Sequence, residues 1–280
     1  MATAVSELTV VPLSDALGAE IRGVDLSKPL DDTTVRAIRQ AWLDHVLLLF
    51  RDQDISNDDQ MRFCRYFGEL ENVRTGEYAT EQMKHTMMIT NVRDTGFRTA
   101  LEDGEMWFHH DQCYYEIPAR ASMLYAMEVP PAGGNTLFAN GYTAWETLPA
   151  DLRAKLDGRR AHHIYDYAGN PVARGANVDP NAPQFLHPVA RTHPETGRKA
   201  LYVNRLMTDW IEGLSPEESA ETLEILFRQG EDRRFVYEHE WRVGDLLMWD
   251  NCCSTHARTW FDPAHRRMMR RITIKGEPVL

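Results

Sequence analysis

The chain has little cysteine and no long apolar segment. Only four of its 280 residues are cysteines, and no two stand in a Cys-x-x-Cys spacing. Cys252 and Cys253 are adjacent and cannot easily bridge each other, which argues against a disulfide scaffold and for a reducing compartment. The longest apolar runs, such as Val46–Phe50, are far too short to cross a membrane. Residues 1–20 have neither a basic start nor a continuous apolar stretch, so we expect no signal peptide.

Basic residues are outnumbered as well. The chain carries 31 Lys and Arg against 42 Asp and Glu, a formal net charge of −11. Without a basic face, a nucleic-acid partner is not expected. No internal repeat, low-complexity stretch or Gly/Ser/Pro-rich linker divides the sequence, which predicts one domain over residues 1–280. These absences together predict an acidic cytoplasmic protein with no membrane or nucleic-acid partner.

Clear helix signals occur in only three segments. Residues 31–45, 56–68 and 215–230 each open on an Asp or Ser cap, and the third has Pro216 in its first turn. Most other patterned segments read as short strands separated by turn signals. The expected strands are residues 8–13, 46–50, 121–129, 135–140, 161–167, 200–204, 233–241, 245–249 and 268–275. We therefore predict a mainly β fold with flanking helices and a sandwich, barrel or jelly-roll core.

The segment WFHHDQCYY, residues 107–115, concentrates possible metal ligands. If it is extended, His109 and Asp111 share one face and His110 points the other way, because a strand has a period of two. On a helix the same pair would lie about 200° apart and could not share an ion. The aromatic neighbours favour a strand. Since His-x-Asp is common by chance, a structural role for this pair stays open.

A third ligand has to come from elsewhere in the chain. His256 stands out, because it follows the predicted strand and turn of GDLLMWDNCCSTH, residues 244–256. The remaining histidines lack purposeful companions. We expect structural roles for His45, His162, His163, His187 and His193, and surface positions for His85, His239 and His265.

Four arginines in RRMMRR follow His256. In a strand, Arg267 and Arg271 would share one face, while Arg266 and Arg270 would share the other. Two arginines four residues apart are separated by about 13 Å at Cα, so they could hold two anions end to end. The alternative is a solvated basic edge strand, which limits aggregation. Periodicity does not show which face points inward.

Taken together, these segments resemble the taurine dioxygenase / 2,4-dichlorophenoxyacetate dioxygenase family of Fe(II), 2-oxoglutarate-dependent dioxygenases. The resemblance runs in order along nearly the whole chain, with His-x-Asp, the distant His and the Arg eleven residues after it all in register. The matching segments are residues 8–27, 67–70, 109–111, 130–149, 186–204, 244–256 and 266–276.

The resemblance implies a double-stranded β-helix (jelly-roll) core and a specific set of site residues. Iron would be held by His109, Asp111 and His256, a two-histidine, one-carboxylate triad with open positions for 2-oxoglutarate and O₂. Thr136 and Arg267 would hold the far carboxylate of 2-oxoglutarate. Arg271 would bind the acidic head of the substrate, and Tyr114 would line its pocket. These roles turn Arg267 and Arg271 inward and leave His110 without a metal role.

The implied reaction is hydroxylation of a small anionic substrate, with release of succinate and CO₂. The presence of Asp111 implies hydroxylation, since halogenating relatives lack that carboxylate. Two departures argue against taurine: no histidine follows FGEL, where Glu71, Asn72 and Val73 stand, and Phe108 precedes the first ligand where many relatives have Trp. With Trp107 nearby, the aromatic residues favour a carboxylate with an apolar or aromatic body.

Other functions remain open from the sequence. An alkylsulfonate (taurine-like) or sulfate ester dioxygenase would also use Arg271. In a different class, the chain would be a non-catalytic 2-oxoglutarate-binding β-sandwich protein. Cys113, Cys252 and Cys253 lie near the ligands and are expected to be packing residues. The resemblance also implies a homo-oligomer, either a dimer or a tetramer.

Overall fold

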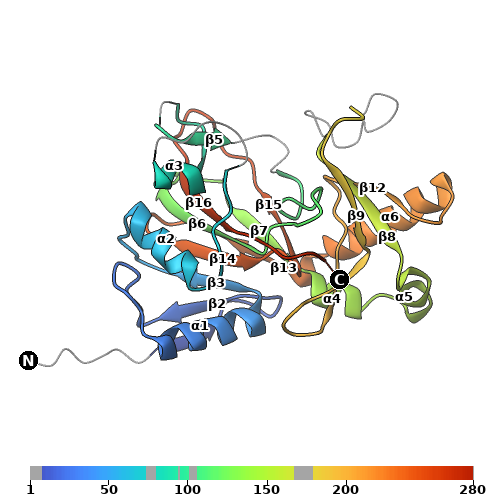
Figure 1. Ribbon diagram of the computed structural model, residues 1–280, viewed down its shortest axis with the longest axis horizontal. Coiled ribbons are helices and arrows are strands. Elements are labelled where there is room, and N and C mark those ends of the chain that lie inside the picture. The colour runs from blue at the N-terminus through green and yellow to red at the C-terminus, as the bar shows by residue number, and fades with distance from the viewer. Residues whose placement is uncertain (1–7, 74–79, 94, 101–105, 167–178, 280) are drawn as a thin grey trace, which may run out of the picture.

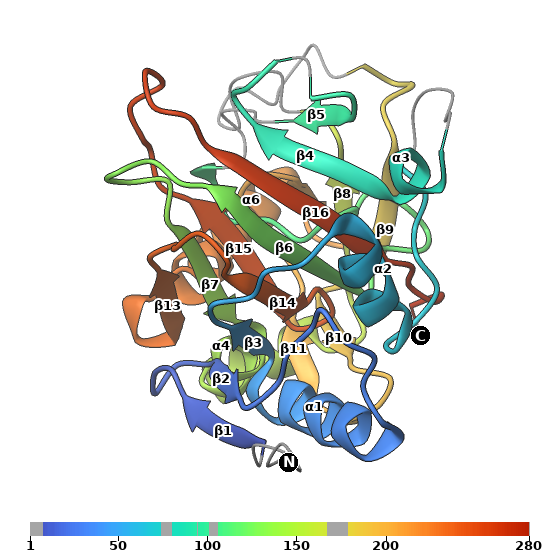
Figure 2. The same cartoon turned by 90° about the vertical axis from the view of Figure 1, so that its left-hand side faces the viewer.

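A computed structural model describes residues 8–73, 80–93, 95–100, 106–166 and 179–279. Its largest element is an eight-stranded sheet in the order β1-β2-β3-β14-β6-β16-β4-β5, which joins strands from both ends of the chain (Figures 1 and 2). Its strands are β1 (Thr9–Pro12), β2 (Ala19–Arg22), β3 (Leu47–Phe50), β14 (Leu246–Asp250), β6 (Ala121–Glu128), β16 (Met268–Ile274), β4 (Thr86–Thr90) and β5 (Arg98–Ala100).

Three smaller sheets complete the β structure of the described residues. The sheet β13-β7-β15 supplies the second layer of the core, and β12-β8-β9 and the pair β10-β11 lie beside it. Their strands are β7 (Thr136–Asn140), β8 (Arg160–Ile164), β9 (Gln184–Pro188), β10 (Ala190–Thr192), β11 (Lys199–Leu201), β12 (Thr208–Ile211), β13 (Val236–His239) and β15 (Ser254–Arg258). The predicted double-stranded β-helix core with flanking helices is confirmed.

The central strand β14 of the large sheet is largely apolar on both faces because both of its faces are covered. In β14, Leu246 and Met248 join a cluster with the helices α1 (Asp32–His45) and α2 (Asn57–Arg65), while Leu247 and Trp249 face the second layer. This alternation follows from the two-residue period of a strand. Figure 2 looks onto the face that α1 and α2 cover. The other face, toward β7 and β15, is where the candidate site forms.

The three predicted helices are confirmed with their caps. Asp31 accepts hydrogen bonds from the first backbone amides of α1, and Ser56 forms a capping box with Asp59 at α2. The helix α6 (Pro216–Gly230) starts after Ser215, whose side chain accepts from Glu218 N–H. Within the described ranges, none of the helices combines the length and apolar character that crossing a bilayer requires.

Three short helices escaped the sequence analysis: α3 (Glu81–His85), α4 (Gly141–Glu146) and α5 (Ala150–Leu156). Each spans two turns or fewer, so its apolar period cannot be told from that of a strand or a turn. The strand expected over residues 200–204 ends at Leu201, although residues 202–204 remain buried. The last residue of the strand expected over 161–167 lies outside the described residues.

Candidate metal centre and adjoining cavities

The segment around His109 is not the strand that the sequence predicted. His109 alone pairs with His256, through backbone N–H···O distances of 3.0 and 2.9 Å, and the chain then turns at residues 111–114. Gln112, directly after Asp111, has a φ of 59°, in the left-handed region that few non-glycine residues adopt. The single bridge fastens His109 beside β15, and the turn carries Asp111 back toward both histidines.

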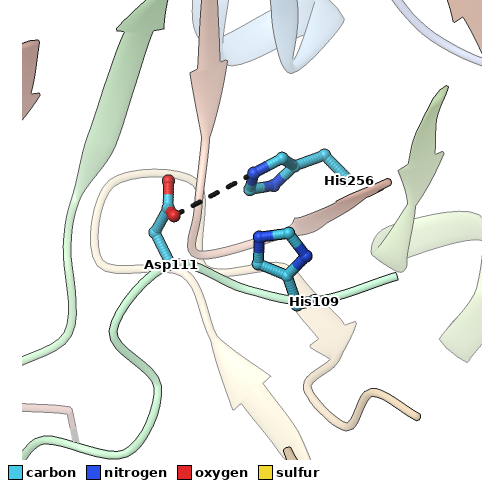
Figure 3. A group of neighbouring side chains, drawn as sticks. All are labelled: His109, Asp111 and His256. Atoms are coloured by element: carbon cyan, nitrogen blue, oxygen red, sulfur yellow. Dashed lines mark ion pairs between the residues drawn. The ribbon is translucent and has the colours of Figure 1, made fainter. Parts of the chain in front are cut away.

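The structure brings together the three predicted ligands, His109, Asp111 and His256 (Figure 3). One potential ligand atom from each lies within 4.8 Å of the others, and all three residues are buried. His109 Nδ1 is 2.8 Å from the carbonyl oxygen of Trp107, so Nδ1 carries a proton and Nε2 is the nitrogen that can serve as a ligand. His256 Nε2 lies 3.9 Å from Asp111 Oδ1. Two imidazole nitrogens and a carboxylate oxygen are a donor set that fits Fe(II).

The protonation states of His256 and Asp111 also suit a bound cation. Burial, together with repulsion from His109, lowers the pKa of His256 to about 3, so this imidazole is neutral at pH 7. Burial alone would raise the pKa of Asp111, but the guanidinium of Arg271 and the two histidines outweigh it and lower that pKa. Arg271 Nη1 is 3.3 Å from Asp111 Oδ1, and Ser122 donates to Oδ2 at 2.5 Å. Asp111 is therefore an anion with one oxygen facing the histidines.

His110 points away from this group. It is fully buried, with its ring 4.2 Å from that of Tyr202 and its Nδ1 3.3 Å from the Asn204 amide nitrogen. Burial and the charge of Arg191 lower the pKa of His110, which keeps it neutral. Its surroundings are those of a packed core histidine.

A small cavity of about 40 Å³ lies beside His109 and His256, between the two layers of the core. Thr136, Arg267 and Arg271 also line it. Trp241 Nε1 donates to Thr136 Oγ1 at 3.0 Å, and Arg267 Nε donates to the carbonyl oxygen of Gly134 at 3.3 Å. The cavity thus places two guanidinium groups and a hydroxyl-bearing residue next to the possible metal ligands.

The strand parity of the arginines holds, although neither face of their strand is solvated. β16 is flanked by β6 and β4, so the alternative of a basic edge strand is wrong. Arg267 and Arg271 line the same cavity. Arg270 is buried on the opposite face, where it donates to Gln60 Oε1 at 2.7 Å and to the carbonyl oxygens of Ile55 and Ser56. Arg270 therefore ties β16 to the start of α2.

A larger cavity of about 440 Å³ adjoins the other side of His109 and Asp111. Tyr114 lines it, and its ring lies 4.6 Å from that of Tyr115 and 4.7 Å from that of Tyr165. Other lining residues include Met87, Arg98, Pro183, Met207 and Arg271. The cavity therefore combines an aromatic wall with an arginine next to the possible metal ligands.

The expected contribution of Trp107 and Phe108 to this wall is wrong. Trp107 is 38% exposed, and Phe108 lines a separate small cavity with Leu201 and Phe227. Both precede the turn at residues 111–114, and it is the turn itself, with Asp111, Gln112 and Tyr114, that lines the larger cavity. Their place is taken by Tyr115 and Tyr165, which the sequence analysis did not single out.

Two further residues of the larger cavity were also missed. His85 was expected at the surface but is buried, with Nδ1 3.0 Å from the carbonyl oxygen of Glu71. Arg98 reaches the cavity because β5 pairs in parallel with β4, placing Arg98 opposite Met87 and, one strand further, Arg271. No local pattern signals this row, since its members come from three separate strands and Arg271 is far from the other two in sequence. His239 was also expected at the surface and is also buried, with its Nε2 3.1 Å from Asp245 Oδ2.

A second buried group, His193, Asp250 and Cys252, also has ligand atoms close together. In this group the guanidinium of Arg120 supplies the positive charge. Arg120 Nη1 is 2.5 Å from Asp250 Oδ1, and Arg120 Nη2 is 3.1 Å from His193 Nε2. Asp250 Oδ2 in turn lies 3.0 Å from His193 Nε2. This arrangement is an ion-pair network that leaves a metal no free carboxylate.

Comparison with known proteins connects the whole chain to one group. The family described as "Taurine catabolism dioxygenase TauD, TfdA family" matches residues 9–273. The chain is 36% identical to pentalenolactone F synthase of Streptomyces avermitilis, over 97% of this chain and 95% of that protein. It is 34% identical to the alpha-ketoglutarate-dependent 2,4-dichlorophenoxyacetate dioxygenase of Cupriavidus pinatubonensis, over 96% and 98%.

Solved structures agree with these sequence matches. The structure of AAD-2 in complex with Mn(II) and N-oxalylglycine superposes with a TM-score of 0.86 at 29% identity, covering 98% of this chain and 99% of that one. The similarity therefore extends over nearly the whole of both chains.

Proposed function

The chain belongs to the taurine catabolism dioxygenase TauD, TfdA family, and from this premise we propose that it hydroxylates a small anionic carboxylate with an apolar or aromatic body. Its cofactors are those of the family, namely Fe(II), 2-oxoglutarate as co-substrate and O₂. Bound together, these supply the activation of O₂ that hydroxylation requires, with release of succinate and CO₂. The observation that carries the proposal is an arginine in a tyrosine-lined cavity directly beside a two-histidine, one-carboxylate group.

In this proposal His109, Asp111 and His256 hold the iron, and Thr136 and Arg267 bind the far carboxylate of 2-oxoglutarate. Support for the first set comes from the two imidazoles and the Asp111 Oδ1 atom, which lie close together in one buried group. Support for the second comes from the small cavity, which both residues line next to His109 and His256. A guanidinium suits a carboxylate because it can donate two parallel hydrogen bonds.

The substrate is proposed to lie in the larger cavity, with its acidic group on Arg271 and its body against Tyr114, Tyr115 and Tyr165. The Nε atom of Arg271 is buried and has no hydrogen-bond partner in the described part of the chain. Leaving a buried donor unpaired is costly, so an anionic group should be favoured there. A planar carboxylate matches the guanidinium better than a tetrahedral sulfonate does.

A sulfonate or sulfate ester is the second candidate, because the family description itself refers to taurine. The decisive experiment is a substrate screen that measures oxygen consumption and succinate release. Aryl and alkyl carboxylates are expected to turn over, whereas taurine and alkyl sulfates should be poor substrates. Efficient turnover of taurine with inert carboxylates would reverse the order of the two candidates. Absence of succinate with every compound would favour the non-catalytic binder.

The two arginines should have separable effects. Arg267→Ala is expected to raise the KM for 2-oxoglutarate about 10- to 150-fold, because a charge-assisted hydrogen bond contributes about 1.5–3 kcal/mol. Arg271→Ala should leave 2-oxoglutarate binding nearly unchanged and weaken substrate binding. Steady-state kinetics with each compound varied in turn would measure both effects.

Since Arg271 also contacts Asp111, metal affinity has to be measured in parallel. Arg266→Ala is a suitable control, because Arg266 pairs with Glu128 at the surface, away from both cavities. An exchange of the two KM effects would contradict the assigned roles of Arg267 and Arg271.

We also propose that the protein is cytoplasmic and forms a dimer or tetramer. The first proposal is supported by its four free cysteines, all of them buried. The second rests on the resemblance to the family, and sedimentation velocity of the purified protein would test it.

A further inference from the structure

We infer that Trp249, Asn251 and Ser122 form a series of hydrogen bonds, all donated in the same direction, that ends on one oxygen of the Asp111 carboxylate. This series fixes the carboxylate so that only its other oxygen is available to a metal. The inference rests on the proposed role of Asp111 as a ligand. It assigns Ser122 as a positioning residue for that ligand.

The series consists of three consecutive hydrogen bonds in the core. Trp249 Nε1 donates to Asn251 Oδ1 at 2.9 Å, Asn251 Nδ2 to Ser122 Oγ at 3.2 Å, and Ser122 Oγ to Asp111 Oδ2 at 2.5 Å. The residues Trp249, Asn251 and Ser122 are at most 1% exposed. Ser122 lies on β6 opposite Trp249 on β14, so the pairing of these two strands fixes the positions of the first and the last donor in the series.

The direction of every proton in this series follows from its first member. An indole N–H can only donate, so the Asn251 atom next to it must be the amide oxygen. That choice turns the Asn251 NH₂ group toward Ser122 Oγ, which must accept. The Ser122 hydroxyl hydrogen is then directed to Asp111, whose ionised carboxylate can only accept. Reversal at any step would set two donors or two acceptors against each other.

The consequence for Asp111 is that its two oxygens become unequal. Oδ2 is occupied by Ser122, while Oδ1 faces His256 Nε2 at 3.9 Å and Arg271 Nη1 at 3.3 Å. An Asp111 that bound iron through both oxygens would fill a position that 2-oxoglutarate and O₂ need. Partners that orient a ligand in this way typically change metal affinity about 10- to 100-fold when they are removed.

The test compares Mn(II) binding, followed by electron paramagnetic resonance, among variants of the full-length chain. Ser122→Ala is expected to weaken binding about 10- to 100-fold. Ser122→Cys keeps the branching and direction of the side chain but offers a much weaker donor, so its affinity should fall nearly as far. Ser219→Ala is the control: Ser219 is buried on α6, accepts from Ile211 N–H and lies outside the site, so Mn(II) affinity should not change.

A second readout reports the coordination itself. The visible absorption of the Co(II)-loaded protein depends on coordination number, and it should change in Ser122→Ala as Asp111 Oδ2 becomes free to bind. Wild-type Mn(II) affinity and Co(II) spectrum in Ser122→Ala, or wild-type affinity in Ser122→Cys with a loss only in Ser122→Ala, would overturn the inference. Mn(II) binding that survives Asp111→Ala would instead contradict the proposed metal site.

Discussion

Asp111→Ala is expected to lose metal binding and turnover together. The substitution removes the only anionic ligand of the proposed site and leaves two imidazoles, which hold Fe(II) poorly. The loss of Fe(II) affinity should exceed the roughly 100-fold that removal of an outer partner can cause. His256→Ala should behave in the same way. Anaerobic titration with Fe(II), followed by succinate release at saturating metal, would measure both effects.

His110→Ala is the comparison for this prediction, because His110 lies between the two ligands in sequence but points into the core beside Tyr202. It should retain metal binding and lose stability instead, by about 2–4 kcal/mol, since a large buried ring leaves a cavity. Urea unfolding would measure that loss. Wild-type-like turnover in Asp111→Ala, or loss of Fe(II) binding in a folded His110→Ala protein, would contradict the ligand assignment.

The positions of the site residues in the sequence explain which of them could be predicted from the sequence alone. His109 and Asp111 carry a local signal in their spacing, the strand and turn before His256 set it apart, and the register of the family resemblance added the role of Arg267. The aromatic neighbours favoured a strand, however, whereas the chain makes one bridge at His109 and then a turn with Gln112 at positive φ. A strand and this turn both bring the side chains of residues 109 and 111 to one side.

The larger cavity could not be foreseen in the same way. Its walls come from segments far apart in the chain, and their meeting is set by the pairing of β16 with β4 and of β4 with β5. Arg98 has no local feature that separates it from any exposed arginine. Trp107 carried an attractive aromatic signal and yet stays outside. Aromatic residues next to a ligand in sequence are thus a poor guide to a pocket once a turn intervenes.

The fold was more accessible because its strands are apolar on both faces or end at clear turn signals. Val46–Phe50 and residues 245–249 were recognisable as strands from composition alone, and α1, α2 and α6 from their caps. The arginines of β16 show the limit of periodicity. It correctly separated Arg267 and Arg271 from Arg270, but it could not show that the strand is central and that α2 buries its other face.

The second large effect is expected from a substitution of Arg120 and concerns the folding stability of the protein. Arg120→Ala should lower the free energy of unfolding by about 3–5 kcal/mol, because it leaves a buried carboxylate without its cation. Asp250 is 1% exposed and Arg120 contacts it at 2.5 Å, while the other end of the guanidinium lies 2.9 Å from Glu195. The same guanidinium covers the ring of Trp42 at 4.4 Å, so packing is lost as well. Urea unfolding at pH 7 would measure the change.

The pH dependence of this loss identifies its cause. Burial alone would raise the pKa of Asp250, but Arg120 and the hydrogen bond from His193 lower it below the ordinary Asp value in the folded protein. The wild type therefore gains stability from ionised Asp250 above the unfolded pKa of about 3.9 and loses it as the pH falls. Without Arg120, burial favours the protonated carboxyl, so acidification relieves part of the penalty. The difference between wild type and Arg120→Ala should thus shrink as the pH is lowered from 7 toward 4.

An exposed arginine supplies the control for this experiment. Arg228 pairs with Glu224 one helical turn away on α6, and its side chain is 76% exposed. Arg228→Ala should change the free energy of unfolding by no more than about 0.5 kcal/mol, as is usual for such pairs. If Arg120→Ala proved equally mild, or if its effect did not change with pH, Asp250 would have to be stabilised by His193 and the backbone alone. The group of His193, Asp250 and Cys252 would then again qualify as a possible cation site.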